Sequence, residues 1–352
     1  MRFAFGAGGT GGHILPAIAL ADELKARGHE SIFIGNSSSM EERLASDAGY
    51  MFFRIRVQKL YRKLTPSNLA FPYHLGASIL QSRRILKEQA IDAVITTGGY
   101  VAGPVALAAI SLKIPSFLHE SNSYPGLTTR YLKRHVDRLY VSFEESRDYL
   151  KGAQIRNFGI PIKKSSEEKF SLADIGLKED AKTLLITGGS QGSYALNSVV
   201  SNCIDALLDS EWQIIWQTGR RSYEEFWRMH KNKKGLYLFD FSNSLRGMMR
   251  KSDLAIARSG AMTIAELESA LLPAILIPLP TSAGNHQYHN AVSQVKKGVA
   301  QLILQESLNP VRLLDAVNSI NIQSMREKLE MLPPNNATEL IVTDILSCIK
   351  EK

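Results

Sequence analysis

Residues 2–13, RFAFGAGGTGGH, place a short apolar run directly before a glycine-rich turn. Gly6, Gly8 and Gly11 have the spacing G-x-G-x-x-G, which is typical of a strand-to-helix turn that approaches a ligand closely. Residues 183–193, TLLITGGSQGS, repeat this arrangement in the second half of the chain. Two such starts predict two doubly wound α/β domains, each with its own parallel sheet.

Short apolar runs alternate with helical patterns around both turns. The predicted strands are residues 2–5, 31–34, 93–97, 114–118 and 138–141 in the first half, and 183–187, 213–216, 236–239, 253–257 and 274–278 in the second. This alternation predicts parallel sheets covered by helices on both faces. Because such sheets bind ligands at the carboxyl ends of their strands, we expect both domains to contribute to a shared cleft.

A charged, serine-rich stretch, KKSSEEKFS at residues 163–171, is typical of an exposed linker between domains. We therefore expect a first domain at residues 1–160 and a second at 161–336. The last segment, residues 337–352, has an amphipathic helical pattern, and we expect it to join the first domain.

The composition is that of a soluble globular protein: of 352 residues, 44% are hydrophobic and 22% are charged, which excludes a disordered chain. Two distant cysteines match no disulfide or metal-site spacing and favour a reducing cytoplasm. Neither a signal peptide nor a membrane-spanning run is expected. Residues 1–160 hold 20 Lys and Arg against 13 Asp and Glu, which indicates an anionic partner: nucleic acid, acidic lipid headgroups or a phosphorylated substrate.

The first glycine turn has two interpretations. A dinucleotide such as NAD requires an acidic residue at the end of the second strand, but that strand runs into Gly35-Asn36-Ser37. The glycines still allow backbone amides to face an oxygen-rich group, and a tight turn without a ligand is the alternative. His13 lies where a general base would be useful, although an exposed helix residue would look the same.

Residues 257–266, ARSGAMTIAE, follow a predicted strand and open a helix. Thr263 and Glu266 fit a capping box, in which Glu266 would bond only to a backbone amide. Alternatively, Ser259, Gly260 and the next amides bind a phosphate, and Glu266 accepts two hydrogen bonds from the cis-diol of a ribose. The segment alone leaves both interpretations open.

Two further loops, GGSQGS at 188–193 and GNHQYHN at 284–290, offer amides and side chains that suit sugar or phosphate oxygens, or are ordinary polar loops. The chain has no D-x-D, H-E-x-x-H, P-loop or EF-hand pattern. We therefore expect no protein-bound metal, and a departing diphosphate would be stabilised by helix ends and amides.

Together these motifs resemble the MurG family of UDP-N-acetylglucosamine:undecaprenyl-pyrophosphoryl-muramyl-pentapeptide N-acetylglucosaminyltransferases. The resemblance covers nearly the whole chain and rests on GGTGGH (8–13), TTGGY (96–100), HESN (119–122), GGSQGS (188–193), RSGAMTIAEL (258–267) and HQYHNA (286–291). It implies a GT-B fold with an acceptor- and membrane-binding first domain and a second domain that binds UDP-N-acetylglucosamine.

The resemblance also implies the reaction. N-acetylglucosamine would pass with inversion, without a metal or cofactor, to the C4 hydroxyl of the muramyl sugar of lipid I, giving lipid II for peptidoglycan synthesis. The enzyme would lie on the cytoplasmic face of the bacterial inner membrane, with cell-wall and division proteins as partners and no nucleic acid. The alternatives are a UDP-N-acetylglucosamine 2-epimerase, a glycolipid glycosyltransferase, a nicotinamide-dependent oxidoreductase or a non-catalytic nucleotide sensor.

His13 is the first candidate for the general base. His119 and Glu120 are reserves, and their alternative role is to position the loop after the predicted strand. The resemblance implies the substrate contacts: Thr10, Gly11 and Gly12 at the donor diphosphate and acceptor, Asn122 at a sugar, Ser242 through its backbone at uracil, Glu266 at the ribose, and Gln287 at the transferred sugar. Ala261, Met262, Thr263, Ile264 and Ala265 would surround the uridine and diphosphate, and Lys163, Ser190 and Arg258 would be further substrate contacts.

The sequence departs from the family pattern at several of these positions. Lys163 replaces the arginine of GNPVR, which loses a planar fork of donors, and Ile160 replaces its asparagine. Thr129 and His286 also replace the usual asparagine and glutamine.

A basic and apolar patch in the first half is a candidate for membrane attachment. Its cations are Lys59, Arg62, Lys63, Arg83, Arg84 and Lys87, around Leu69, Phe71, Tyr73, Leu75, Ile79 and Leu80. Such a patch suits anionic lipids. The alternative is a helix that packs on the core and exposes a solvated basic face.

Overall fold

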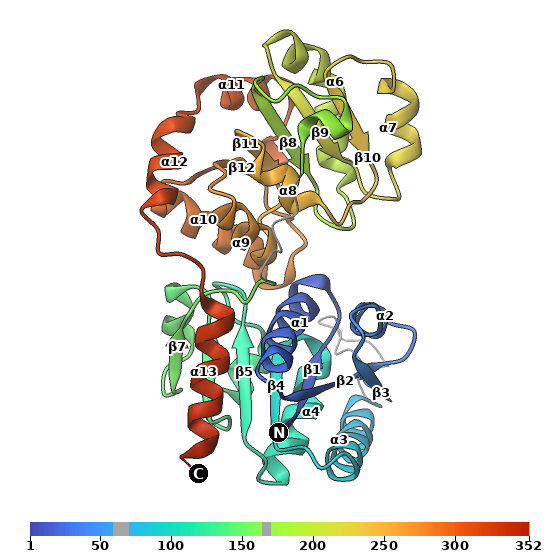
Figure 1. Cartoon of the computed structure of the whole chain (residues 1–352), viewed down its shortest axis with the longest axis vertical. Helices are drawn as coiled ribbons and strands as arrows, with labels where there is room; N and C mark the ends of the chain where they lie inside the picture. Colours follow the sequence, from blue (N-terminus) through green and yellow to red (C-terminus); the bar gives the residue numbers. More distant parts are fainter. Residues whose placement is uncertain (59–69, 164–169, 352) are drawn as a thin grey trace. The chain divides into compact units, whose positions relative to one another are not determined.

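The computed structural model describes residues 1–58, 70–163 and 170–351 (Figure 1). The chain divides into two compact units: unit 1 comprises Met1–Lys164 and Asn335–Lys352, and unit 2 comprises Ser165–Pro334. Each unit is built on a parallel sheet of its own, so the predicted two-domain, doubly wound α/β fold is confirmed.

Unit 1 contains a seven-stranded sheet in the order β3-β2-β1-β4-β5-β6-β7. The strands are β1 (Arg2–Ala7), β2 (Glu30–Asn36), β3 (Met51–Ile55), β4 (Ala93–Gly98), β5 (Ser116–Glu120), β6 (Arg138–Val141) and β7 (Ile155–Asn157). The helices are α1 (Gly11–Ala26), α2 (Met40–Asp47), α3 (Phe71–Glu88), α4 (Gly99–Ser111), α5 (Leu127–Leu132) and α13 (Ala337–Lys350), with a 3₁₀ turn at Glu144–Tyr149.

The two faces of this sheet have separate cores because side chains alternate along each strand. Phe3 and Phe5 of β1 pack in a cluster with residues of α1 and α13, whereas Ala4 packs on the opposite face with residues of α3 and α4. Both clusters consist mainly of fully buried aliphatic and aromatic side chains. Helices therefore cover both faces of the sheet.

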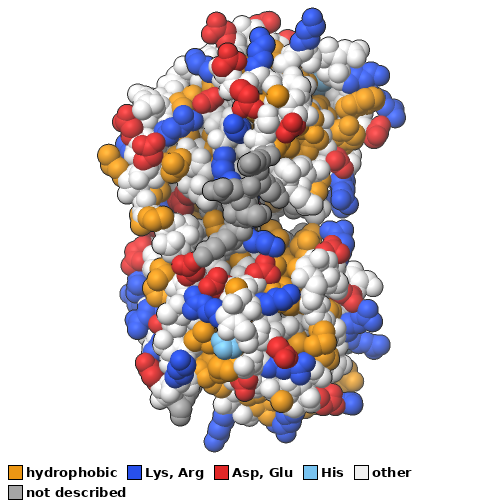
Figure 2. Space-filling model, in the orientation of Figure 1, with side chains coloured by type: hydrophobic (Ala, Val, Ile, Leu, Met, Phe, Trp, Pro, Cys, Tyr) orange, Lys and Arg blue, Asp and Glu red, His pale blue; other side chains and the backbone are white. Residues whose placement is uncertain are grey.

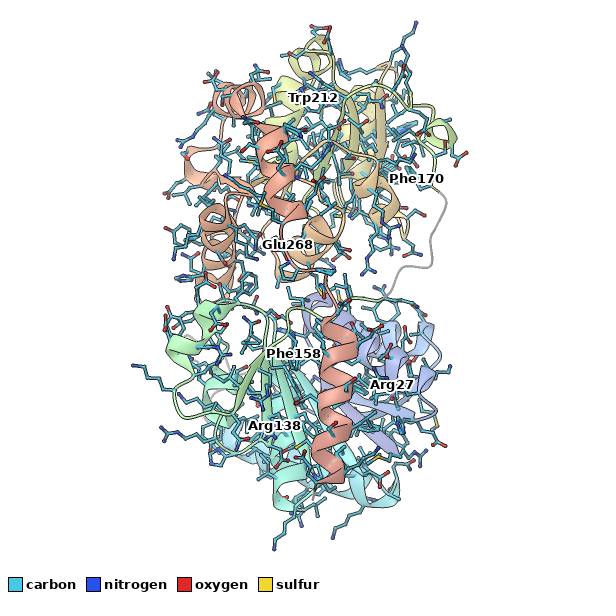
Figure 3. The ribbon with its side chains drawn as sticks, turned by 60° about the vertical axis from the view of Figure 1, so that its left-hand side comes forward. Arg27, Arg138, Phe158, Phe170, Trp212 and Glu268 are labelled. Atoms are coloured by element: carbon cyan, nitrogen blue, oxygen red, sulfur yellow. The ribbon has the colours of Figure 1, made fainter. Side chains whose placement is uncertain are left out.

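The C-terminal helix α13 belongs to unit 1, and Figure 3 shows it running along this unit beside Arg27 and Arg138. Arg27 Nη1 donates to Thr343 Oγ1 at 2.9 Å. The Tyr140 hydroxyl donates to Asp344 Oδ2 at 2.8 Å. The apolar residues of α13, including Ile341, are buried in the cluster that also contains Phe3 and Phe5. The helix completes one face of the unit 1 core.

Unit 2 contains a six-stranded sheet in the order β10-β9-β8-β11-β12-β13. The strands are β8 (Thr183–Thr187), β9 (Gln213–Gln217), β10 (Leu236–Phe239), β11 (Leu254–Ala257), β12 (Ala274–Leu276) and β13 (Ala300–Leu302). The helices are α6 (Tyr194–Asp209), α7 (Tyr223–His230), α8 (Leu245–Arg250), α9 (Ala261–Ser269), α10 (His286–Lys297), α11 (Pro310–Ser319) and α12 (Ile322–Glu330), with 3₁₀ turns at Leu172–Ile175, Ala283–Asn285 and Gln305–Ser307.

No helix in the described ranges is both long and apolar enough to cross a membrane.

Candidate active site

The glycine-rich turns lie where the strand order reverses in each sheet. This reversal falls between β1 and β4 in unit 1, and between β8 and β11 in unit 2. Doubly wound sheets bind ligands at the carboxyl ends of the strands beside this point. Residues 8–13 follow β1 and residues 188–193 follow β8, so each unit presents a glycine turn at the position that the fold favours for a ligand.

The first turn of α1 consists of Gly11, Gly12 and His13, because the helix begins at Gly11. Thr10 precedes it with extended backbone and makes no side-chain capping bond. This turn carries no acidic residue, and the amides at the start of a 16-residue helix have partial positive charge. The arrangement suits an anionic or oxygen-rich ligand.

The His13 imidazole is oriented by the same turn. Its Nδ1 lies 3.1 Å from the Gly8 carbonyl oxygen and 3.3 Å from Thr10 Oγ1. A carbonyl oxygen can only accept a hydrogen bond, so Nδ1 carries the proton in the neutral ring. Nε2 then carries the lone pair, which is the chemical requirement for a general base at that atom.

A second glycine pair, Gly98 and Gly99 of the TTGGY motif, packs against this histidine. Both have positive φ, +103° and +80°. A Cβ atom at position 98 would lie 2.8 Å from His13 Cδ2, and one at position 99 would lie 1.8 Å from the Gly8 carbonyl oxygen. Only glycine tolerates both the backbone conformation and the close approach. The sequence pattern identified this motif but not its role.

Glu41 of α2 was not singled out by the sequence, yet it contacts both the turn at residues 8–13 and the TTGGY motif at residues 96–100. Its side chain is buried, Oε2 accepts a hydrogen bond from the Gly9 amide at 3.4 Å, and Oε1 accepts one from the Tyr100 hydroxyl at 3.4 Å. The carboxylate thus links the turn after β1 to the start of α4.

Glu120 ends β5 with a buried carboxylate that is fully engaged by its own loop. Oε1 accepts hydrogen bonds from the Asn122 backbone amide at 3.0 Å and from Asn122 Nδ2 at 3.1 Å. Oε2 accepts from the Gly126 amide at 3.0 Å and from Thr129 Oγ1 at 2.5 Å. These contacts favour the loop-positioning role over that of a base, and Thr129 supplies one of the four donors.

His119 is also placed for structure rather than proton transfer. It is fully buried, and its Nε2 lies 3.1 Å from the Gly159 carbonyl oxygen. Burial lowers the pKa of His119 to about 4. The ring is therefore neutral at physiological pH and has no access to solvent.

In unit 2, Arg258 connects the loops that follow three strands. Its guanidinium is buried and donates to the Ile277 and Pro278 carbonyls at 3.0 Å each, and to Ser193 Oγ at 2.6 Å. Burial lowers the pKa of Arg258 to about 10, so it remains cationic at neutral pH. Within the described residues it forms no salt bridge. These contacts favour an indirect role, through charge and loop geometry, over the direct contact that we predicted.

Of the two interpretations of Thr263 and Glu266, the capping box is wrong. Helix α9 begins at Ala261 with Gly260 as its N-cap and no side-chain cap, so Thr263 already lies inside the helix. The first-turn amides of α9 are the groups that could face a phosphate. The side chains of the predicted contacts Ala261, Met262, Ile264 and Ala265 are buried, which leaves their backbone for any contact.

Glu266 forms a salt bridge that the sequence did not suggest. Its Oε1 lies 3.1 Å from Nε of Arg246 in α8. Burial raises the pKa of Glu266, and the charge and hydrogen bond of Arg246 oppose that shift. The pair has no signal in the sequence because its members belong to different helices.

The remaining predicted contacts occupy different loops. Ser190 is exposed in the turn after β8. Ser242 lies before α8, and its Oγ accepts from the Ser244 amide at 3.0 Å, which directs the side chain to its own loop. Gln287, in the first turn of α10, accepts from the Leu279 amide through Oε1 at 3.0 Å.

Lys163 lies in unit 1, although we predicted it in the second domain. Its Nζ forms an ion pair with Asp22 Oδ2 of α1 at 3.3 Å. Nearby, the departure Ile160 is buried, and its carbonyl accepts from Asn335 Nδ2 at 3.1 Å. His286 Nδ1 lies 2.7 Å from the Ala283 carbonyl oxygen at the start of α10.

In the part of the chain that the structure describes, no group of three or more His, Cys, Asp or Glu side chains could hold a metal ion.

Comparison with known proteins assigns both units to one family. The Glycosyltransferase family 28 N-terminal domain matches residues 3–141, and the Glycosyltransferase family 28 C-terminal domain matches residues 183–343. The crystal structure of MurG from Acinetobacter baumannii is 27% identical, superposes with a TM-score of 0.79, and covers 98% of this chain and 99% of that one.

Two relatives that are named as N-acetylglucosamine transferases of this kind are similar over nearly their whole length. One from Halothermothrix orenii is 35% identical over 335 residues, which is 91% of this chain and 90% of the relative. One from Bacillus subtilis is 34% identical over 340 residues, which is 94% of each chain. The chain therefore belongs to the family of UDP-N-acetylglucosamine–N-acetylmuramyl-(pentapeptide) pyrophosphoryl-undecaprenol N-acetylglucosamine transferases, the MurG glycosyltransferases.

Proposed function

We propose that the protein transfers N-acetylglucosamine from UDP-N-acetylglucosamine to the C4 hydroxyl of the muramyl sugar of lipid I, with inversion, and so forms lipid II. The observation that carries this proposal is the similarity of both halves to transferases named for this reaction, over at least 90% of each chain. Two switch-point sites, one in each unit, support a reaction with two substrates.

Unit 2 binds the nucleotide sugar in this proposal. The amides at the start of α9 and the turn at 188–193 face the diphosphate, as helix N-termini do for anions. Glu266 accepts the ribose hydroxyls, and the backbone at Ser242 contacts uracil. Gln287 contacts the transferred sugar, and because its Oε1 already accepts from Leu279, its Nε2 is the atom that we assign to this contact.

Unit 1 binds the acceptor in this proposal, and His13 takes its proton. As the C4 oxygen attacks the anomeric carbon, Nε2 of His13 accepts the hydroxyl proton and the bond from the anomeric carbon to the diphosphate oxygen breaks. The electron pair of that bond leaves with UDP. The N-terminal amides of the helices and the positive charge of Arg258 stabilise the departing diphosphate, without a metal.

A transfer assay tests the function. Labelled UDP-N-acetylglucosamine is incubated with and without a lipid I analogue, in each case with and without EDTA, and both UDP release and lipid-linked label are followed. We expect both products only with the acceptor, and unchanged rates in EDTA. Conversion of the sugar to its 2-epimer without an acceptor would instead identify an epimerase.

Donor binding is expected to weaken as the pH falls. Burial raises the pKa of Glu266, so this carboxyl becomes protonated at a higher pH than an ordinary glutamate and then loses acceptor capacity. Arg246 of α8 faces it, and Glu268 on the same helix is paired with Lys297 of α10. The Kd for UDP, measured by calorimetry from about pH 8 to about pH 5, should rise in the wild type. A flat profile in the wild type, or the same rise in Glu266→Gln, would contradict the assignment.

We further propose that the exposed side of α3 attaches the protein to anionic lipids at the cytoplasmic face of the inner membrane. Tyr73 and Leu80 are 76% and 67% exposed, and Figure 2 shows hydrophobic side chains interspersed with Lys and Arg over this region. Arg84 and Lys87 are exposed beside them, although Arg84 is paired with Glu88. Four members of the predicted patch, Lys59, Arg62, Lys63 and Leu69, lie outside the described residues.

The predicted patch also requires one correction. Ile79 packs against the core of unit 1 instead of pointing to solvent, so it fits the alternative of a core-facing helix side. The exposed members alone support a lipid contact, and cell-wall or division proteins would reach the enzyme at this membrane surface.

Replacing Leu80 with Glu is expected to weaken binding to vesicles containing phosphatidylglycerol about tenfold, because it removes an exposed apolar side chain and adds a like charge. Flotation at rising salt should also release the wild type. Leu340→Glu, at another exposed leucine of unit 1, is the matched control. Vesicle binding that does not change with salt, with the lipid headgroup or with the Leu80→Glu substitution would contradict the proposal.

A further inference from the structure

Arg246 is the cation that contacts the Glu266 carboxylate. It lies in the first turn of α8, and its Nε contacts Glu266 Oε1 of α9 at 3.1 Å. The two side chains expose only 27% and 17% of their surface. The salt bridge is thus largely withdrawn from solvent, where such contacts are stronger than at an exposed surface.

A carboxylate that binds a cis-diol must present its oxygens in a defined direction. The two hydroxyls of a ribose are held rigidly by the sugar ring, so a small rotation of the carboxylate misaligns both hydrogen bonds. A guanidinium that holds Oε1 removes this freedom and leaves the lone pairs of Oε2 pointing in one direction. The Glu266 side chain has then already lost its conformational freedom in the free protein, so this entropy loss no longer opposes nucleotide binding.

Arg246 also supplies the counter-charge that a half-buried carboxylate needs. Glu268, two residues further along α9, forms its own ion pair with Lys297 at 2.7 Å and so faces a different cation. Helix α9 thus carries two ion pairs, Glu266 with Arg246 at the expected ribose position and Glu268 with Lys297 away from it. Breaking the second pair is a matched control for breaking the first.

We propose that Arg246 is a positioning residue that makes the nucleotide site selective for ribonucleoside diphosphates over nucleotides that lack the ribose hydroxyls. This inference rests on the proposed function, because it assumes that Glu266 accepts those hydroxyls.

The test compares UDP with 2′,3′-dideoxy-UDP, with Kd measured by calorimetry. We expect the wild type to prefer UDP. Arg246→Gln should weaken UDP binding about tenfold and change the binding of the dideoxy nucleotide by less than about twofold. Arg246→Lys keeps the charge but loses the planar fork, and should weaken UDP binding about threefold. Lys297→Gln, which breaks the other ion pair on α9, should change neither Kd.

A double-variant cycle separates this inference from the proposed function. Arg246→Gln should have no further effect on UDP binding once Glu266→Gln is present. If Arg246→Gln weakens both nucleotides equally, or leaves UDP binding unchanged while Glu266→Gln reduces it, the positioning role is wrong and the ribose role of Glu266 stands. If the wild type does not discriminate between the nucleotides and Glu266→Gln has no effect, both are wrong.

Discussion

Replacing His13 with alanine is expected to lower kcat about 10²- to 10⁴-fold, the range typical for loss of a general base. The imidazole sits at the start of α1, and Nδ1 is committed to the Gly8 carbonyl, which leaves the lone pair on Nε2. Alanine removes that lone pair without changing the helix. Binding of UDP-N-acetylglucosamine should stay within about twofold, because our proposal places the nucleotide in unit 2.

Steady-state transfer kinetics with a lipid I analogue measure this effect. His135→Ala is the matched control, because His135 is an exposed histidine of unit 1 outside the glycine turns, and it should behave as the wild type. A His13→Ala enzyme with near-normal kcat would contradict the assignment of the base.

Replacing Glu120 with glutamine is expected to lower the free energy of unfolding by about 2–4 kcal/mol, because two of four hydrogen bonds lose an acceptor inside the protein. Glutamine has the same size but offers one acceptor oxygen and one donor nitrogen. The Asn122 loop should loosen as a result, so KM for the acceptor should rise more than kcat falls.

Urea denaturation, with transfer kinetics on the same samples, separates the two roles of Glu120. Thr129→Val removes one donor from the same carboxylate and should cost about 1–2 kcal/mol. If Glu120 were the base, Glu120→Gln would instead lower kcat as strongly as His13→Ala.

The interior of both sheets could be predicted from sequence. Strands buried on both faces read as continuous apolar runs, and the predicted range 183–187 coincides with β8, which lies inside its sheet. The edge strand β10 was also predicted, at 236–239, because all four of its residues are apolar. The three strands that were missed, β3, β7 and β13, all lie at an edge of a sheet. Edge strands are often short and only partly buried. Strand β3 is mostly half-buried or exposed and contains an arginine, and β13 has only three residues. Their apolar signal is too weak to detect.

In the candidate site, residues within a local motif could be found from the sequence, but contacts between distant parts of the chain could not. His13 and Glu266 could be chosen as candidates because each lies beside a glycine turn with a recognisable spacing, and their roles stay predictions. Glu41 and Arg246 could not, because each acts on a turn or helix through a contact between distant parts of the chain. The capping box at Thr263 failed because the helix starts three residues earlier, with Gly260 and not Thr263 as its N-cap, and local propensity does not fix a helix boundary.

A structure of the protein with UDP tests the central claim most directly. We predict that the nucleotide lies in unit 2, with its ribose hydroxyls on the Glu266 carboxylate and its diphosphate at the amides that begin α9. UDP bound in unit 1, or in unit 2 without contact to Glu266, would contradict the account.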